Sequence, residues 1–383
     1  TAIEQLGAPC PANPAVAPLL GLVDSLIARE PGRFVVIANW HRGAHALLSL
    51  ARLDPGRVKT VLSRVGSARE WQVRMYAARA AGIIGDGDQL LHLADDENDN
   101  VREAAIAGLV RVRGHALDSV YRAQLDRPDY QLIIGAAAAL AGAPDRARTA
   151  AALRRSLLRI TAERKETSRD PRLAILERLA ELGSADDAPA LEPLLTDFDP
   201  AVANRAAELI STWTGTRAVA SPRPLPPAPL DAAAIERLRG SRLKVTMTTS
   251  AGGGSFELAL YPELAPATVW RIVTRARQGY YDGLTFHRIV PNFVIQGGSP
   301  NGNEYVGDAF YMRDEVGPIA HERGTLGIST RGRDTGDAQI FVNLVDNPRL
   351  DFEYTVFGKV VSGMDVVDAI MEGDAIDRVD LVN

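Results

Sequence analysis

The sequence has one cysteine, Cys10, and only four lysines among its 383 residues. A lone thiol cannot form an intramolecular disulfide or a zinc cluster, so neither is expected to stabilise the fold. The other 39 of the 43 basic residues are arginine. Because alanine is abundant too, we interpret this as a codon-composition bias rather than a binding patch. With 43 basic and 48 acidic residues, the chain lacks the strong field of one sign that recruits nucleic acid or anionic membrane.

A long hydrophobic run is also missing. The longest apolar candidate, Leu132 to Ala143, fits a buried helix, because a membrane span needs about 18 or more apolar residues. The chain begins with Thr1 rather than Met. We therefore expect that an N-terminal piece has been removed, which could have held a signal peptide, an anchor or a whole domain.

The length predicts two or three domains, and 46% hydrophobic residues supply a sizeable core. Five prolines lie between Ser221 and Leu230, where neither helix nor central strand is expected, so this stretch predicts an extended spacer. Residues 1–240 hold 30 basic and 29 acidic residues, whereas 241–383 hold 13 and 19. We predict four parts: an extension (1–14), a helical domain (15–215), a proline-rich linker (216–239) and a second domain (240–383).

The helical part contains an internal repeat. A polar or acidic start, an apolar anchor and an alanine-rich helix ending near glycine recur, with anchors 28, 31, 41 and 29 residues apart. The anchors are Val73, Val101, Leu132, Leu173 and Val202, and the glycines are Gly82, Gly114, Gly142, Gly183 and Gly215. Aspartate suits the N-cap, proline the first turn and glycine the left-handed position after a helix. Such recurrence is typical of an α-solenoid; a non-repeating helical bundle is the alternative.

The sequence Asp-Asn-Val-Arg-Glu-Ala-Ala at 99–105 resembles HEAT repeats, particularly the short bacterial kind. Recurrence of the pattern extends the resemblance over about residues 15–215. It implies a curved stack of helix pairs that binds or spaces other proteins, so a protein partner is expected on this surface.

The second part begins with strand patterns. Leu243–Thr249 and Phe256–Tyr261 flank a glycine-rich segment at 251–255, which predicts a hairpin. A phosphate-binding loop is disfavoured, because a strand rather than a helix follows the glycines. Pro266 then opens a helix that runs to about Arg277.

The segment F-H-R-I-V-P-N-F-V-I-Q-G-G at 286–298 is an apolar strand pair with polar side chains inside it. Arg288 and Gln296 are unfavourable among so many apolar neighbours unless something needs their donors. Further segments follow at 339–343 (Q-I-F-V-N), 350–351 (L-D) and 354–360 (Y-T-V-F-G-K-V).

These four segments resemble, in order and spacing, the motifs of cyclophilin-type peptidyl-prolyl cis–trans isomerases. The resemblance covers about residues 240–383. It implies an eight-stranded antiparallel β-barrel with two capping helices, here Ala267–Arg277 and Met364–Met371. It also implies isomerisation of X–Pro bonds in peptides and protein clients, with no cofactor and no metal.

The resemblance assigns a role to each matching residue. Arg288 stands at the catalytic arginine and Gln296 at the glutamine that contacts the substrate backbone. The remaining positions match the proline pocket (Phe293, Val294, Phe341 and Leu350), the segment that pairs with the substrate backbone (Ser329, Thr330 and Arg331), a second polar pocket residue (Gln339) and the edge of the pocket (Tyr354).

The sequence departs from the family pattern at two positions. Arg349 replaces the tryptophan of cyclosporin-sensitive members, which predicts weak drug binding. Ile340 replaces a phenylalanine, and because it alternates with Phe341 we expect it to face away from the pocket.

The chemistry has a simple physical basis. An X–Pro bond isomerises over a barrier of about 18–20 kcal/mol. Amide resonance is lost at the twisted transition state, so a guanidinium aimed at the prolyl nitrogen binds the transition state more tightly than the planar ground state. The reaction needs no proton transfer, so we interpret His287 as a hydrogen-bonded structural residue rather than a general base.

Other candidate sites are weaker. His41 and His45 would share a helix face, but no third zinc ligand stands near them. The acidic run 95–99 lacks the glycine and glutamate of a calcium loop. We therefore expect solvated turns at both.

The sequence predicts a cyclophilin-like isomerase that acts on protein clients and carries HEAT-like repeats as a binding or spacing module. One alternative is a peptide-binding scaffold without turnover, which the presence of both Arg288 and Gln296 disfavours. Another makes the helical part the main functional element. No nucleic acid and no membrane span are expected, and the compartment, a bacterial cytoplasm or periplasm, stays open.

Overall fold

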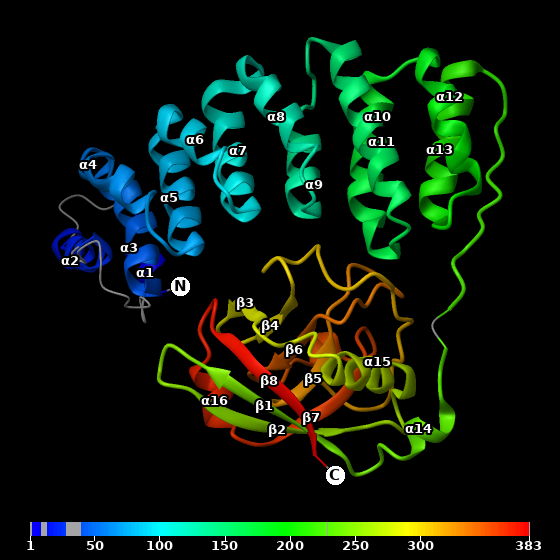
Figure 1. Ribbon diagram of the computed structural model, residues 1–383. Coiled ribbons are helices and arrows are strands. Elements are labelled where there is room, and N and C mark those ends of the chain that lie inside the picture. The colour runs from blue at the N-terminus through cyan, green and yellow to red at the C-terminus, as the bar shows by residue number, and fades with distance from the viewer. Residues whose placement is uncertain (1, 9–13, 28–39, 228, 383) are drawn as a thin grey trace. The chain divides into compact units, whose positions relative to one another are not determined.

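The computed structural model describes residues 2–8, 14–27, 40–227 and 229–382, and Cys10 lies outside them. The chain divides into two compact units, Thr1–Leu225 and Pro226–Asn383. We call them the helical unit and the barrel unit. Figure 1 shows the helices of the first and the sheet of the second.

The helical unit is built from short helices that stack in chain order. Each of α3, α5, α7, α9 and α11 packs against the next odd-numbered helix. The helices are α1 (Ala2–Gln5), α2 (Val16–Ile27), α3 (Trp40–Leu53), α4 (Pro55–Val65), α5 (Trp71–Ile84), α6 (Gly87–Leu93), α7 (Asp99–Arg113), α8 (Asp118–Gln124), α9 (Tyr130–Ala139), α10 (Arg146–Ala162), α11 (Arg169–Leu182), α12 (Ala188–Leu191) and α13 (Pro200–Thr214).

The expected repeat signals hold at some helix ends and fail at others. Asp129 and Asp199 cap α9 and α13 through their side chains, and Gly215 has the left-handed φ of 70° after α13. The expectation for Gly82 is wrong, because α5 continues to Ile84 and Gly85 takes the left-handed position with φ of 74°. Gly183, with φ of −78°, is not left-handed either.

One of the five anchors is also misplaced. Leu173 is only half-buried, whereas its neighbour Arg172 is completely buried. The Nη1 of Arg172 donates to both carboxylate oxygens of Asp197 at 2.8 Å, and its guanidinium lies 4.3 Å from the centre of the Phe198 ring. An ion pair and an aromatic face thus compensate for burying this charge where an apolar side chain was predicted.

The barrel unit is a closed barrel in which neighbouring strands are antiparallel. The strand order is β1-β2-β7-β5-β6-β4-β3-β8. The strands are β1 (Arg242–Thr248), β2 (Gly254–Leu260), β3 (Thr285–Val290), β4 (Val294–Ser299), β5 (Thr325–Ile328), β6 (Ile340–Asn343), β7 (Val356–Ser362) and β8 (Ala375–Val382). The expected hairpin is the pair β1 and β2, with Val245 opposite Phe256.

Two helices complete the barrel core. α15 (Pro266–Arg277) and α16 (Met364–Ala369) contribute Val269, Ile272 and Val367 to the apolar cluster that fills the barrel. The second helix ends two residues earlier than expected. Each barrel strand therefore turns one face to the apolar core and the other face to the outside of the barrel, where the candidate active site lies.

The proline-rich stretch is shorter than the expected linker. In the helical unit, the backbone amides of Ser221 and Arg223 donate to carbonyls of Leu195 and Asp197. In the barrel unit, α14 (Ala232–Glu236) buries Ile235, and Leu238 belongs to the barrel core. Apolar side chains at the end of the stretch explain this helix, which the prolines obscure in the sequence.

Candidate active site

A β-bulge brings Arg288 and Gln296 to the same face of the sheet. In a regular strand Phe286 and Arg288 would point the same way. The register between β3 and β4 shifts between these two residues, so His287 is an extra residue on β3. Phe286 and Ile289 pack in the barrel core, while Arg288 pairs with Gln296 on the outer face.

The polar side of the site is a chain of hydrogen bonds that begins at Arg288. Its Nη1 donates to Oε1 of Gln296 at 3.2 Å. The Nε2 of Gln296 donates to the Ser329 hydroxyl at 2.9 Å and to Oε1 of Gln339 at 3.3 Å. Gln296 is almost fully buried, so its amide is held in one orientation by these partners.

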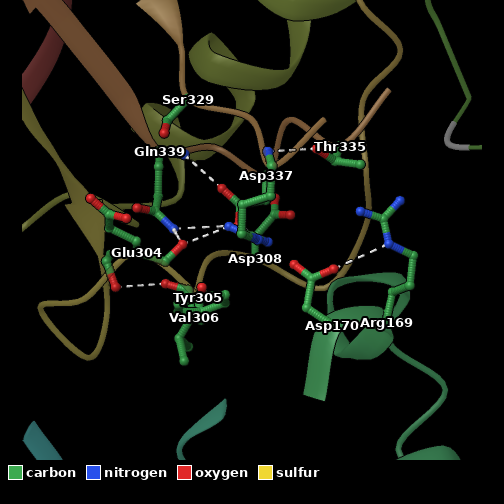
Figure 2. A network of polar contacts seen from close by, with 12 residues as sticks. Arg169, Asp170, Glu304, Tyr305, Val306, Asp308, Ser329, Thr335, Asp337 and Gln339 are labelled. Carbon is green, nitrogen blue, oxygen red and sulfur yellow. Dashed lines mark hydrogen bonds and ion pairs between the residues drawn. The ribbon is translucent and has the colours of Figure 1, made fainter. Parts of the chain in front are cut away.

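Gln339 stands behind the wall of the site rather than on it. It is completely buried, and its Nε2 donates to the carbonyl of Glu304 at 3.1 Å and to Asp337 at 3.4 Å. Figure 2 shows Gln339 between these two residues. The expectation that Gln339 lines the pocket is therefore wrong: it positions Gln296.

The apolar side of the site is a small cluster separate from the barrel core. It consists of Val294, Phe341 and Leu350, with Phe293 and Tyr354 packed against it. The rings of Phe341 and Tyr354 meet edge to face, with centroids 5.9 Å apart. Ile340 lies in the barrel core instead, which confirms that it faces away from Phe341.

A glycine makes room for the floor of this cluster. Gly327 lies opposite Phe341 on the neighbouring strand β5. A Cβ at position 327 would lie within 2.2 Å of Cζ of Phe341. The outer end of the Phe341 ring thus occupies space that only glycine at position 327 leaves open.

Together these side chains line a groove of about 630 Å³, part of which is open to solvent. Ten of the predicted site residues line it: Arg288, Phe293, Val294, Gln296, Ser329, Thr330, Arg331, Phe341, Leu350 and Tyr354. One wall is apolar and the other carries a cation and amide groups, which suits a peptide with one apolar ring.

Three residues of the site escaped the sequence analysis. Glu304 lines the groove, and its Oε1 lies 2.9 Å from Nε of Arg288. Asp337 is completely buried beside Gln339 and pairs with Arg331 at 3.1 Å. Neither carboxylate has a periodic or motif signal, since both lie in loops that only the closed barrel brings to the site.

The third is His321, which supports the apolar wall. Its ring stacks on Phe341, with centroids 5.7 Å apart. Its Nδ1 lies 3.1 Å from the Asn343 amide nitrogen and its Nε2 lies 3.3 Å from the Tyr354 carbonyl. This pattern fits a neutral ring that accepts at Nδ1 and donates at Nε2, and burial lowers the pKa of His321.

Burial is also the main cause of the shifted pKa values of two groups near the groove, Asp337 and His287. It raises the pKa of Asp337, although the Arg331 guanidinium opposes the shift. Burial lowers the pKa of His287 to about 4, and the charge of Arg288 acts in the same direction. A backbone interaction with Thr285 opposes this shift, although neither ring nitrogen of His287 has a partner of strict hydrogen-bond geometry among the described residues. His287 is therefore a buried, neutral histidine, as expected for a structural residue.

Arg349 stands where cyclosporin-sensitive members of the family carry a tryptophan, so a planar guanidinium replaces an aromatic ring. Its guanidinium lies 4.2 Å from the centre of the Phe293 ring. The cation thus packs on Phe293, a residue of the groove wall, but Arg349 does not itself line the groove.

The weaker candidates form no site in the described ranges. No three His, Cys, Asp or Glu side chains there gather to hold a metal ion. The Nδ1 of His45 instead contacts Glu4 at 2.8 Å, and Asp96 pairs with Arg74. Within the same ranges, no helix is both long enough and apolar enough to span a bilayer.

Comparison with known proteins identifies the family to which the barrel unit belongs. Residues 244–381 match the model of the family described as cyclophilin type peptidyl-prolyl cis-trans isomerase/CLD. The chain is 42% identical over 129 residues to peptidyl-prolyl cis-trans isomerase B of Bacillus subtilis, a match that covers 33% of this chain and 90% of that protein. It is 43% identical over 136 residues to a peptidyl-prolyl cis-trans isomerase of Helicobacter pylori, covering 34% and 83%.

A crystal structure of a cyclophilin type peptidyl-prolyl cis-trans isomerase from Cryptosporidium parvum is also similar. It shares 25% identity, covers 37% of this chain and 98% of its own, and has a TM-score of 0.34. The two bacterial matches carry the assignment, since this chain covers most of each relative. Through its barrel unit, the chain belongs to the cyclophilin-type peptidyl-prolyl cis–trans isomerases and has their isomerase activity.

Proposed function

We propose that Arg288 is the catalytic donor of this isomerase and that the groove holds the proline ring of a peptide. One observation carries the proposal. The guanidinium is fixed at Nη1 by Gln296 and at Nε by Glu304, and among the described residues its Nη2 contacts no acceptor. A charged donor therefore stays available at the edge of an apolar pocket.

In this mechanism the pyrrolidine ring lies against Phe341 and Leu350. The prolyl nitrogen gains a lone pair as the peptide bond twists, and Arg288 donates to it. This contact exists only away from planarity, so it lowers the barrier rather than tightening the ground state. The serine-to-arginine segment 329–331 and Gln296 hold the peptide backbone while the bond rotates.

The test is Arg288→Ala in the full chain. We expect kcat/KM on an Ala-Pro peptide to fall by roughly 10²–10³, equivalent to about 2.7–4 kcal/mol, which is typical when one transition-state donor is removed. Arg288→Lys should recover little, because a flexible ammonium does not reproduce the planar fork. NMR exchange spectroscopy at saturating peptide separates turnover from binding.

Phe341→Ala is the contrasting variant. It removes the floor of the pocket, so we expect peptide affinity to fall more than the exchange rate of bound peptide. If Arg288→Ala exchanges bound peptide at nearly the wild-type rate, Arg288 is structural and the proposed role is wrong.

We also propose that residues of about 15–215 form a HEAT-like α-solenoid that binds or spaces protein clients. The support is the stacking of α3 to α13 in chain order together with the recurring sequence pattern. Hydrogen–deuterium exchange of the full chain with an unfolded, proline-containing client tests it. Protection should extend into α5 to α13, whereas an Ala-Pro tetrapeptide should protect the groove alone. Protection confined to the groove with both ligands would contradict a client-binding role.

A further inference from the structure

We propose that Glu304 is a positioning residue for the isomerase reaction, acting on the guanidinium of Arg288. The inference rests on the proposed role of Arg288. The contact itself is a carboxylate oxygen 2.9 Å from Nε, on the edge of the groove that both residues line. The side chains are 40% and 48% exposed.

An ion pair with this exposure usually contributes little, because two long side chains lose entropy when they are held together. Glu304 differs in that its backbone is already fixed. Its carbonyl accepts hydrogen bonds from Nε2 of Gln339 at 3.1 Å and from Nη1 of Arg331 at 2.6 Å. Both donors belong to the polar face of the site, so the ordering that places the carboxylate does not depend on the ion pair.

The loop around Glu304 is tied down at its other residues too. The Ser299 hydroxyl donates to the carbonyl of Val306 at 2.6 Å, and the amide of Tyr305 donates to the side chain of Asn303 at 3.1 Å. Figure 2 shows Glu304, Tyr305 and Val306 beside the buried Gln339 and Asp337. The backbone that carries the Glu304 side chain is thus held in place by hydrogen bonds at three consecutive residues.

The consequence is geometric. Gln296 holds one edge of the guanidinium through Nη1 and Glu304 holds another through Nε. Two contacts on different nitrogens define the plane of the fork, so Nη2 points in one direction. Small misplacements of a reacting group lower turnover strongly, whereas the apolar pocket that binds proline does not contain Glu304.

Glu304→Ala and Glu304→Gln separate the hydrogen bond from the charge. Glu304→Ala removes both, and we expect the exchange rate of bound peptide to fall about 3- to 10-fold with the dissociation constant changed less than about twofold. Glu304→Gln keeps an oxygen that can accept from Nε, so it should retain at least half of the wild-type rate. The Nε–Hε resonance of Arg288 should shift in the alanine variant and stay close to its wild-type position in the glutamine variant.

Glu353→Ala is the matched control. Glu353 pairs with Arg333 at 3.2 Å, with side chains 58% and 60% exposed, somewhat more than those of the Glu304 pair, and neither residue lines the groove. This variant should keep the wild-type exchange rate. A loss as large as that of Glu304→Ala would show that any rim charge matters and would overturn the proposal.

A double-mutant cycle distinguishes failure of this inference from failure of the proposed function. If Glu304 acts through Arg288, adding Glu304→Ala to Arg288→Ala should change the rate by less than about 1.5-fold. A full further loss in that background means that Glu304 acts independently, which overturns the positioning role and leaves Arg288 catalytic. Wild-type exchange in Arg288→Ala alone overturns the proposed function itself. Wild-type exchange in Glu304→Ala, or equal losses in the alanine and glutamine variants, overturns the positioning role.

Discussion

The helical and barrel units differ in how far along the chain their contacts reach. In the helical unit, ion pairs such as Arg74–Asp96 and Arg172–Asp197 join residues 22 and 25 positions apart. In the barrel unit, β1 pairs with both β2 and β8, and Thr248 bonds to Asp377, 129 positions away. A local sequence pattern can therefore indicate the helices, but closure of the barrel depends on contacts that no local pattern contains.

The units also differ in what their buried polar groups accomplish. The helical unit buries Arg172 with Asp197, and neither residue lines the groove, so this pair stabilises or specifies the packing of the helices. The barrel unit buries Gln296, Gln339 and Asp337 at or beside the groove, and Gln296 bonds to Arg288 there. Buried polar groups thus stabilise packing in one unit, and in the other they support the proposed catalytic donor.

Asp197→Ala tests this difference between the two units, and it should have a larger effect on stability than the other variants. It leaves a completely buried guanidinium unpaired, so we expect the helical unit to lose about 3–5 kcal/mol. Turnover of a short Ala-Pro peptide should not change, because Asp197 belongs to the helical unit and does not line the groove. Thermal unfolding by circular dichroism and a peptide assay at 15 °C measure the two effects.

Glu177→Ala is the control within the same unit. Glu177 pairs with Arg205 at 2.7 Å but is 70% exposed, so its removal should change stability by less than about 1 kcal/mol. Equal destabilisation by both variants, or loss of peptide turnover in Asp197→Ala, would contradict the separation of roles.

The pH dependence should differ between the stability and the turnover of the barrel unit. Arginine side chains as a class stay charged at neutral and mildly alkaline pH, so the proposed arginine mechanism predicts nearly constant turnover from about pH 6 to 9. The pKa of His287 is lowered to about 4, whereas that of an unfolded histidine is about 6.5. The unfolded state therefore binds the proton first as the pH falls, and stability should decrease between about pH 6.5 and 4 by up to about 3 kcal/mol.

Urea unfolding followed by loss of isomerase activity measures this loss of stability. His287→Leu should remove most of the acid destabilisation, because no proton can bind there in either state. Parallel stability curves for wild type and variant would show that His287 is not the group responsible. A bell-shaped turnover profile centred near neutrality would falsify the arginine mechanism.

Gly327→Ala should have the smallest of these effects, confined to the groove. The new Cβ would displace the Phe341 ring, so we expect a loss of about 1–3 kcal/mol in stability and weaker binding of the peptide. Gly317→Ala is the control, since no atom lies within 4 Å of a Cβ at that position. Titration of peptide by NMR compares the two. Unchanged affinity in Gly327→Ala would mean that the ring adjusts freely and that the glycine is not required for the pocket.

Much of the groove could be predicted because its residues lie in or beside short, recognisable sequence motifs. Phe293, Val294 and Gln296 stand within four positions of one another, and alternation alone assigns Ile340 and Phe341 to opposite faces. The bulge at His287 was not predictable from alternation, since a regular strand would place Arg288 on the side of Phe286. The resemblance to a family, rather than the period of the strand, identified Arg288.

The errors in the helical unit have a local cause. The pattern favours Leu173 as an anchor because apolar residues usually point inward, but the inward position belongs to Arg172, whose partner Asp197 lies in the following repeat. The pattern also favours Gly82 as a helix end, although Gly85 has the left-handed conformation three residues later. Residue propensities indicate that an anchor or a helix end lies in a segment. Packing between repeats decides which of two neighbouring residues takes that position.

By itself, the sequence determined the helical character of the first unit, the strands of the second and most of the side chains that line the groove. These features depend on capping, alternation and motif spacing, which act over a few residues. Only the tertiary structure decided that Gln339 stands behind Gln296, that His321 supports Phe341 and that Glu304 reaches Arg288. Each of these contacts joins loops or strands that become neighbours when the barrel closes, and their energies depend on burial and orientation, which have no counterpart in a linear pattern.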